Sequence, residues 1–240
     1  MTRHDGRETG QLRSLKAELG YMEFAEGSCL FQMGRTRVLS AATVEEGVPS
    51  FLRGSGAGWV TAEYSMLPRA CQSRNQREST SGKVQGRTME IQRLIGRACR
   101  AIVDTRQLGE RTIWIDCDVL QADGGTRCAS INAAYLALSG AIEYLLEQNL
   151  LRSNPIISEL AAVSVGVVHG EPMVDLDYYE DSQAGVDMNI VATGKGELVE
   201  VQGSAEGKPF ARKQLDNLLN LALVGCQEIV EFQREVLARK

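Results

Sequence analysis

The sequence is poor in residues that several classes of enzyme and secreted protein need. Its only two histidines, His4 and His169, lie in a terminal tail and a predicted turn, and its six cysteines form no CxxC pair. This pattern argues against a histidine-based nucleophilic site, a zinc knuckle and a disulfide framework. We expect most of the cysteines to be buried as small apolar side chains. A P-loop is excluded because no GxxxxGK[ST] motif occurs.

Long hydrophobic runs are also missing. No stretch of about 18 apolar residues occurs, and residues 1–16 are polar, so neither a membrane span nor a secretory signal is predicted. We therefore expect a cytoplasmic protein with no membrane partner. The hydrophobic (43%) and charged (24%) fractions are those of an ordinary globular chain. This length suits one large domain or two small ones tightly joined, and we take residues 1–240 as a single domain.

The net charge of −5 conceals an uneven distribution. Residues 69–111 contain 10 basic and 4 acidic residues, whereas residues 112–240 contain 9 basic and 19 acidic residues. One concentrated arginine segment in an acidic chain indicates a single surface that faces an anion. A solvated helix with a charged outer face would give the same composition, so the composition leaves both interpretations open.

Hydrophobic periodicity and turn residues predict an α+β fold with a mixed sheet and helices over one face. Strands are expected at 11–46 (two or three short ones), 60–66, 112–120, 161–168, 172–178, 185–193 and 197–203. Helices are expected at 87–105, for about 20 residues from Thr126, and at 210–237. Residues 67–86 form a long polar loop, which is uncommon unless the loop is functional or mobile.

Arginines stand out in the loop and in the helix that follows it. Arg87 lies at the start of the predicted helix near its apolar side, where the helix dipole disfavours a cation, so it needs a carboxylate or an anionic ligand. The arginines on the opposite side of that helix are Arg93, Arg97 and Arg100. They are candidate partners for Asp116 and Asp118, which share one face of the strand at 112–120.

The segment Asp123-Gly124-Gly125-Thr126-Arg127 lies at a strand-to-helix junction. Two glycines allow backbone amides to converge on an anion, and the helix N-terminus adds further unpaired amides. The hydroxyl of Thr126 and the planar guanidinium of Arg127 suit phosphate. The segment therefore predicts a phosphate site, with a plain tight turn as the alternative.

A pair of carboxylates follows in the segment 178–189. Asp187 stands between Val186 and Met188 in a predicted strand, and Asp181 precedes it across a turn. Together they suit a hard cation such as Mg²⁺, or a general acid. One turn aspartate and one paired strand aspartate would explain the same residues.

Several segments together resemble the ribonuclease PH family, nearly from end to end. They are GWVTAEYSMLPRA (58–70), RNQRES (74–79), GRTMEIQRLIGRA (86–98), DCDVLQADGGTR (116–127), EDSQAGVDMN (180–189) and VEVQGSAEG (199–207). The resemblance implies a phosphorolytic 3′→5′ exoribonuclease that trims tRNA precursors and releases nucleoside 5′-diphosphates. It also implies the fold of the second domain of ribosomal protein S5, and a homohexamer built as a trimer of dimers.

The resemblance assigns roles to residues of this chain. Inorganic phosphate, the co-substrate, would be held by Arg87, Gly125, Thr126 and Arg127. Asp181 and Asp187 would hold Mg²⁺, or Mn²⁺, or would protonate the leaving 3′ oxygen. The tRNA acceptor stem would be held by Arg69, Arg74 and Arg77.

Two other functions compete with this one. A catalytically silent, RNA-binding ring subunit of the exosome type would typically lack the phosphate-binding arginine or the aspartates, but this chain retains them. A metal-dependent hydrolytic nuclease would release monophosphates and would not respond to added phosphate. The predicted phosphate site argues against it, because a hydrolase has no use for a second anion site.

Overall fold

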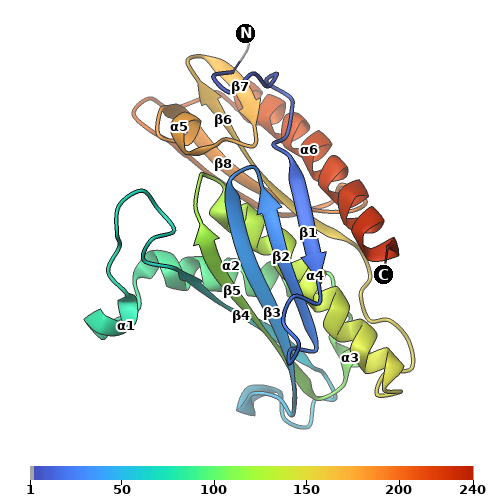
Figure 1. The fold of residues 1–240 in the computed structure, drawn as a ribbon. Helices are drawn as coiled ribbons and strands as arrows, with labels where there is room; N and C mark the ends of the chain where they lie inside the picture. Colours follow the sequence, from blue (N-terminus) through green and yellow to red (C-terminus); the bar gives the residue numbers. More distant parts are fainter. Residues whose placement is uncertain (1–2, 240) are drawn as a thin grey trace.

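A computed structural model describes residues 3–239, which form two β-sheets and their covering helices (Figure 1). The first sheet has the strand order β1-β2-β3-β5-β4, in which only β4 and β5 are parallel. Its strands are β1 (Leu15–Leu19), β2 (Gly27–Met33), β3 (Thr36–Glu46), β4 (Trp59–Met66) and β5 (Arg111–Gln121). The second sheet is antiparallel, with the order β7-β6-β8-β9. Its strands are β6 (Leu160–Val168), β7 (Glu171–Val174), β8 (Ala184–Thr193) and β9 (Leu198–Ala205).

Helices occupy the space between the sheets and one outer face. The long helices are α2 (Gly86–Ala101), α4 (Thr126–Glu147) and α6 (Arg212–Ala238). The short ones are η1 (Ser50–Leu52), α1 (Glu78–Ser81), α3 (Thr105–Leu108) and α5 (Tyr178–Asp181). α4 packs on β2, β3 and β5 on one side and on β6 on the other, while α2 lies beside α4 against β4. α6 covers the opposite face of β6 (Figure 1). The predicted α+β class, with a mixed sheet covered by helices on one face, is confirmed.

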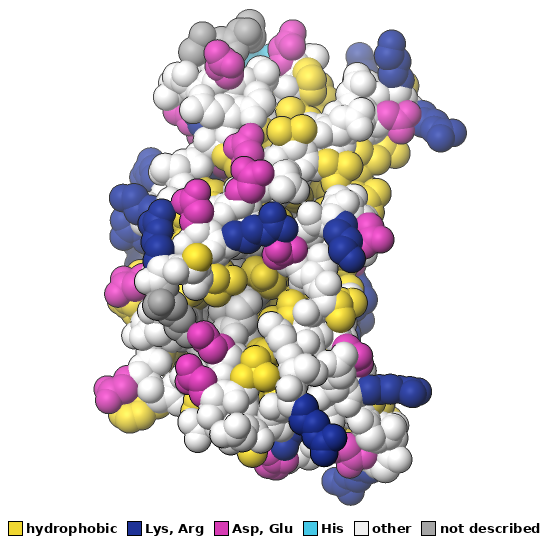
Figure 2. All heavy atoms as spheres, turned by 90° about the vertical axis from the view of Figure 1, so that its right-hand side faces the viewer, with side chains coloured by type: hydrophobic (Ala, Val, Ile, Leu, Met, Phe, Trp, Pro, Cys, Tyr) yellow, Lys and Arg dark blue, Asp and Glu magenta, His cyan; other side chains and the backbone are white. Residues whose placement is uncertain are grey.

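The alternation within β5 shows how the sequence produces this layering. Ile113, Ile115, Cys117 and Val119 are fully buried or nearly so, and they point toward the helices. α4 itself is apolar on nearly every side because both its faces are covered. It is the one helix among residues 3–239 with the length and composition of a membrane span, and 72% of the tested window is buried inside the protein. Figure 2 shows the side that carries α6, where acidic and basic side chains are interspersed.

Two predicted elements end earlier than expected. The helix predicted to reach residue 105 ends at Ala101, and Asp104 starts α3 by accepting hydrogen bonds from the amides of Arg106 and Gln107. The strand predicted to reach residue 178 ends at Val174. Asp175 has a positive φ of 52°, and Asp177 caps α5. In both places an aspartate near the boundary bonds locally and starts a new turn, which a periodicity argument does not detect.

The expected pairing of strand aspartates with helix arginines is wrong. α2 packs on the face of the sheet opposite to Asp116 and Asp118. Arg100 also lies differently from the prediction: its guanidinium stacks 4.0 Å from the ring centroid of Trp59 and donates a 2.6 Å hydrogen bond to the carbonyl of Val60. The cysteine prediction is confirmed, because five of the six are buried and all are free thiols.

Candidate active site

A cavity of about 730 Å³ lies where the starts of α2 and α4 face the second sheet. One side of it carries cations and backbone amides, and the other carries carboxylates. We call the first the cationic wall, made of Arg69, Arg87, Gly124, Gly125, Thr126 and Arg127. We call the second the acidic wall, made of Asp181 and Asp187. Ser164, Tyr178 and Asn189 lie with the acidic wall.

The glycine turn of the cationic wall has a conformation that other residues rarely adopt. Gly124 and Gly125 have φ values of 74° and 64°. A Cβ atom on Gly124 would lie 2.5 Å from the carbonyl carbon of Asp177, so the turn packs directly against the start of α5. The hydroxyl of Thr36 accepts from the amide of Asp123 at 2.9 Å and donates to the carbonyl of Gly124 at 2.7 Å. α4 begins at Thr126 immediately afterwards, so its N-terminal amides face the cavity.

Side chains outside the predicted site orient Thr126 and Arg127. The phenol of Tyr64 donates to the hydroxyl of Thr126 at 3.3 Å. Arg127 pairs with Glu90 of α2 at 3.2 Å, and Glu90 also accepts a 3.0 Å hydrogen bond from Gln202 of β9. Burial raises the pKa of Glu90, but these two partners and the charge of Arg87 together outweigh that effect and lower the pKa overall. The Nε atom of Arg127 is buried without a hydrogen-bond partner among the described residues.

The two aspartates of the acidic wall are partly removed from water. Burial raises the pKa of Asp187 to about 6; the charge of Asp181 adds to this increase, and Arg127 and Arg87 oppose it. Burial also raises the pKa of Asp181, again against the charges of Arg87 and Arg127. Since Arg87 and Arg127 lower the pKa of both aspartates, the two walls lie close enough to act on one bound molecule. A carboxylate with a pKa near 6 can exchange protons at neutral pH.

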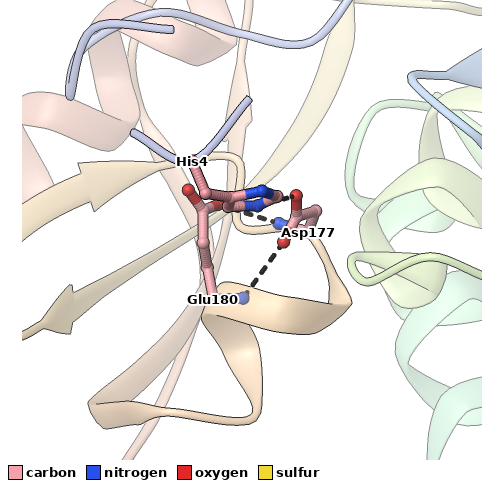
Figure 3. A group of neighbouring side chains, drawn as sticks. All are labelled: His4, Asp177 and Glu180. Carbon is pink, nitrogen blue, oxygen red and sulfur yellow. Dashed lines mark hydrogen bonds and ion pairs between the residues drawn. The ribbon is translucent and has the colours of Figure 1, made fainter. Parts of the chain in front are cut away.

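Asp181 is held in place by an anchored α5. Asp177 and Glu180 form a capping box at the start of this helix. His4 pairs with Asp177 at 2.7 Å (Figure 3). Its ring lies 4.7 Å from that of Tyr179. His4, Asp177 and Glu180 are close enough to hold a metal ion. However, both oxygens of each carboxylate already accept hydrogen bonds or ion pairs from His4, Arg3 or backbone amides. We interpret the group as an anchor for α5.

Three arginines of the N-terminal segment complete this anchor. Arg3 bonds to Glu180, and Arg13 forms a bidentate pair with the buried Asp175, at 2.6 and 3.0 Å. Arg7 lies between them and bonds to Glu180 at 3.3 Å. Arg13 also donates to the carbonyl of Asp123, which connects the anchor to the glycine turn. These residues were not predicted to belong to the site, although three arginines near one terminus and a dense acidic run at 175–181 are visible signals in the sequence.

The structure brings most of the predicted site residues together. Those that line the cavity are Arg69, Arg87, Gly125, Thr126, Arg127, Asp181 and Asp187. The other two arginines predicted to hold RNA, Arg74 and Arg77, do not line it. Arg77 lies near Asp118. Burial raises the pKa of Asp118, and the positive charge of Arg77 partly offsets that increase. The polar segment 67–86 contains the short helix α1, and the Glu78 carboxylate of that helix accepts a 2.6 Å hydrogen bond from Thr88 at the start of α2.

Comparisons with known proteins agree with this architecture. Two models of the 3′ exoribonuclease family match the chain: domain 1 over residues 11–142 and domain 2 over residues 159–225. The chain is 55% identical to ribonuclease PH of Bacillus subtilis over 98% of its length and 96% of that protein. It is 52% identical to ribonuclease PH of Syntrophomonas wolfei over 99% of both chains.

Solved structures share the fold at low sequence identity. Rice Rrp46 superposes with a TM-score of 0.80 at 19% identity and covers 98% of this chain and 100% of its own. A chain of the Archaeoglobus fulgidus exosome gives 0.81 at 23% identity, covering 95% of this chain and 91% of its own. The whole-length relatives and the two family models lead to one conclusion: this chain belongs to the 3′ exoribonuclease family, within its ribonuclease PH branch.

Proposed function

We propose that this chain is a phosphorolytic 3′→5′ exoribonuclease that shortens the 3′ extensions of tRNA precursors. The observation that carries the proposal is the cavity itself, where a cationic anion site faces a pair of carboxylates. The unpartnered Nε of Arg127 is a buried donor that an anion would satisfy. A hydrolase would need only one anion site, for the RNA phosphate. The cationic wall offers a second, for an attacking inorganic phosphate.

The proposed reaction is a displacement at the last phosphodiester. An oxygen of inorganic phosphate attacks the phosphorus, and the bond from phosphorus to the O3′ of the preceding nucleotide breaks. A nucleoside 5′-diphosphate leaves, and O3′ takes up a proton. Arg87, Arg127 and the amides around Gly125 hold the attacking phosphate, which offsets the repulsion between two anions. Holding it beside the RNA end also provides proximity.

The acidic wall fits either of two tasks. Asp187, with a pKa of about 6, can deliver the proton to O3′ near neutral pH. Alternatively, Asp181 and Asp187 would hold Mg²⁺ or Mn²⁺. Their hard oxygen donors suit these ions, and no hydrogen bond from a described residue contributes to the pKa of either carboxylate. When bound, such an ion neutralises charge on the phosphoryl oxygens.

Product identity tests the proposal. The purified chain is incubated with a 3′-extended, end-labelled tRNA and Mg²⁺, with and without inorganic phosphate, and the released nucleotides are resolved. We expect nucleoside diphosphates that appear only when phosphate is present. Monophosphates released regardless of phosphate would establish a hydrolase. Bound tRNA without any release would indicate a silent ring subunit.

We further propose that Arg69, Arg74 and Arg77 hold the tRNA acceptor stem through its phosphates. Arg69 lines the cavity, and the other two are exposed near it, on the same polar segment. The double variant Arg74→Ala with Arg77→Ala should weaken tRNA binding and reduce its salt dependence by about two in the slope of log K against log salt. A short unstructured RNA should be affected less, because it lacks a stem. Equal losses on both RNAs would contradict a tRNA-specific role.

We also propose that the protein is a cytoplasmic homohexamer, a trimer of dimers, in which each chain folds as one domain. One buried hydrophobic cluster includes residues of both sheets, which supports a single folding unit. Exposed aromatic residues such as Phe24, 95% exposed, are of the kind that subunit contacts cover. Native mass spectrometry tests the assembly, and calorimetry of the chain tests whether both sheets unfold in one transition.

A further inference from the structure

Asn189 is a further polar residue that lines the cavity, beside the acidic wall. It lies on β8 two residues after Asp187, so both side chains leave the same face of the strand, roughly 7 Å apart. In the sheet register Asn189 is opposite Ser164 of β6 on one side and Gln202 of β9 on the other. This row of side chains crosses the sheet in front of the start of α4.

The neighbours of Asn189 belong to the cationic wall or hold it in place. Ser164 Oγ would lie 3.7 Å from a Cβ atom on Gly125, so the serine borders the glycine turn. Gln202 is bonded to Glu90, which pairs with Arg127. Asn189 therefore lies between the two parts of the proposed phosphate site.

The amide of Asn189 is held in one orientation by a buried thiol. The Sγ–H of Cys128 donates to Oδ1 of Asn189, with a separation of 3.2 Å. Cys128 is 1% exposed, and burial raises its pKa well above the usual value for a thiol. The thiol therefore stays protonated at physiological pH and remains a donor. No described residue accepts a hydrogen bond from Nδ2 of Asn189, and this atom is not among the fully buried, unpartnered polar atoms. Because the residue lines the cavity, Nδ2 is open to it.

We propose that Asn189 contacts the substrate by donating from Nδ2 to a phosphoryl oxygen beside Asp187, and that Cys128 is a positioning residue that keeps the amide turned this way. The inference rests on the proposed phosphorolytic function and adds two residues to its machinery. A neutral amide suits this place, because it can stabilise an anion without introducing another charge near Asp181 and Asp187.

The test uses matched substitutions at both positions. Asn189→Ala removes the donor, Cys128→Ala removes only the group that orients it, and Cys128→Ser restores a donor of similar size. Cys226→Ala is the control, because that buried thiol bonds to a carbonyl of β6 and does not line the cavity. Steady-state kinetics with saturating RNA, RNA dissociation constants and melting temperatures are measured for each purified chain.

We expect Asn189→Ala to lower kcat/KM for phosphate about 10-fold or more while the RNA dissociation constant changes less than about twofold. Cys128→Ala should lower kcat/KM for phosphate about threefold, and Cys128→Ser should recover most of that loss. Adding Cys128→Ala to Asn189→Ala should cause no further kinetic loss, because the thiol acts only through the amide. Cys226→Ala should change the melting temperature without changing kcat/KM.

Two results would overturn the inference. One is an Asn189→Ala enzyme with unchanged kcat/KM for phosphate. The other is a kinetic loss in Cys128→Ala that persists in the Asn189→Ala background or is not recovered by serine, which would indicate a general packing defect. If Cys128→Ala does not fold, Cys128→Val, which fills the space without a donor, takes its place in the same kinetics. Asn189→Leu, which removes the donor without adding a charge, then tests the amide alongside Asn189→Ala. The unsubstituted chain distinguishes the two proposals, because a failure of phosphorolysis itself would appear there first.

Discussion

The cationic wall and the acidic wall of the cavity are constructed in different ways. Gly124, Gly125, Thr126 and Arg127 are consecutive. Arg87 lies in the first turn of α2, which packs beside α4. The acidic wall instead depends on contacts between segments far apart in sequence, because the helix that carries Asp181 is anchored by Arg3 and His4. The cationic wall is made of guanidinium groups and backbone amides. The acidic wall has raised pKa values and can change its charge.

This difference explains how one cavity could bind two anions. In the proposed reaction, the arginines would compensate the charge of the reacting phosphates, while a carboxylate near its pKa would move a proton or bind a cation. The acidic wall also depends electrostatically on the cationic wall, since the charges of Arg87 and Arg127 partly offset the increase that burial causes in both aspartate pKa values. The following changes test each wall separately, from the largest expected effect to the smallest.

Asp187→Asn removes one carboxylate from the acidic wall with little change in the shape of the side chain. Loss of a general acid or of a metal-binding carboxylate should lower kcat by about 10²- to 10⁴-fold. RNA affinity should be retained, because the cationic residues are untouched. Single-turnover rates and RNA dissociation constants measure the two effects. Full activity in this variant would remove Asp187 from the catalytic residues.

Arg127→Ala removes one guanidinium group from the cationic wall. Removal of a charged donor from the anion site should raise KM for phosphate about 10- to 100-fold while RNA binding persists. Arg97→Ala is the matched control, because this arginine of α2 pairs with Glu200 and does not line the cavity. An equal collapse of RNA binding would contradict the assignment of Arg127 to phosphate.

The pH dependence of activity should separate the two tasks of Asp187, whose pKa is about 6. A general acid must be protonated, so kcat/KM would fall as the pH rises through this value. A metal ligand must be ionised, so kcat/KM would rise with pH, and the midpoint would move lower with more Mg²⁺. In Arg127→Ala the midpoint should move higher, because a nearby positive charge is lost.

Protein stability provides a check on the sign of the same shift. The folded-state pKa of Asp187 lies above the unfolded value of roughly 3.9, so ionisation of this group opposes folding. Asp187→Asn should therefore be more stable than the unsubstituted chain at pH 8, by about 1 kcal/mol after allowance for solvent screening. The difference should disappear below about pH 4. Urea unfolding at the two pH values measures it.

Tyr64→Phe should cause the smallest effect. It removes only the hydrogen bond that the phenol donates to Thr126, at 3.3 Å. In the unsubstituted chain this hydrogen bond orients the Thr126 hydroxyl so that its own hydrogen points toward the cavity, and without the phenol that orientation is lost. We expect KM for phosphate to rise about two- to fivefold with kcat unchanged. In a Thr126→Val background the same change should have no effect, and a persistent effect would show that Tyr64 acts by another route.

Much of the local structure could be predicted from the sequence. The long helices and most strands lie near their predicted positions, because their apolar periods and turn residues are local signals. Gly124 and Gly125 form the predicted turn before a helix for the same reason. Errors occurred where a side chain made a specific contact that periodicity does not encode, as with Arg100 on Trp59 and Asp177 at the start of α5.

The sequence by itself determined the α+β class, the family and the residue types of both walls, because motifs and hydrophobic patterns are written along the chain. Only the tertiary structure decided that Arg87, Arg127, Asp181 and Asp187 share one cavity. It also decided that an N-terminal arginine cluster holds α5 and that Cys128 turns the amide of Asn189. These contacts join segments up to 177 residues apart, and they form only when both sheets close around α4.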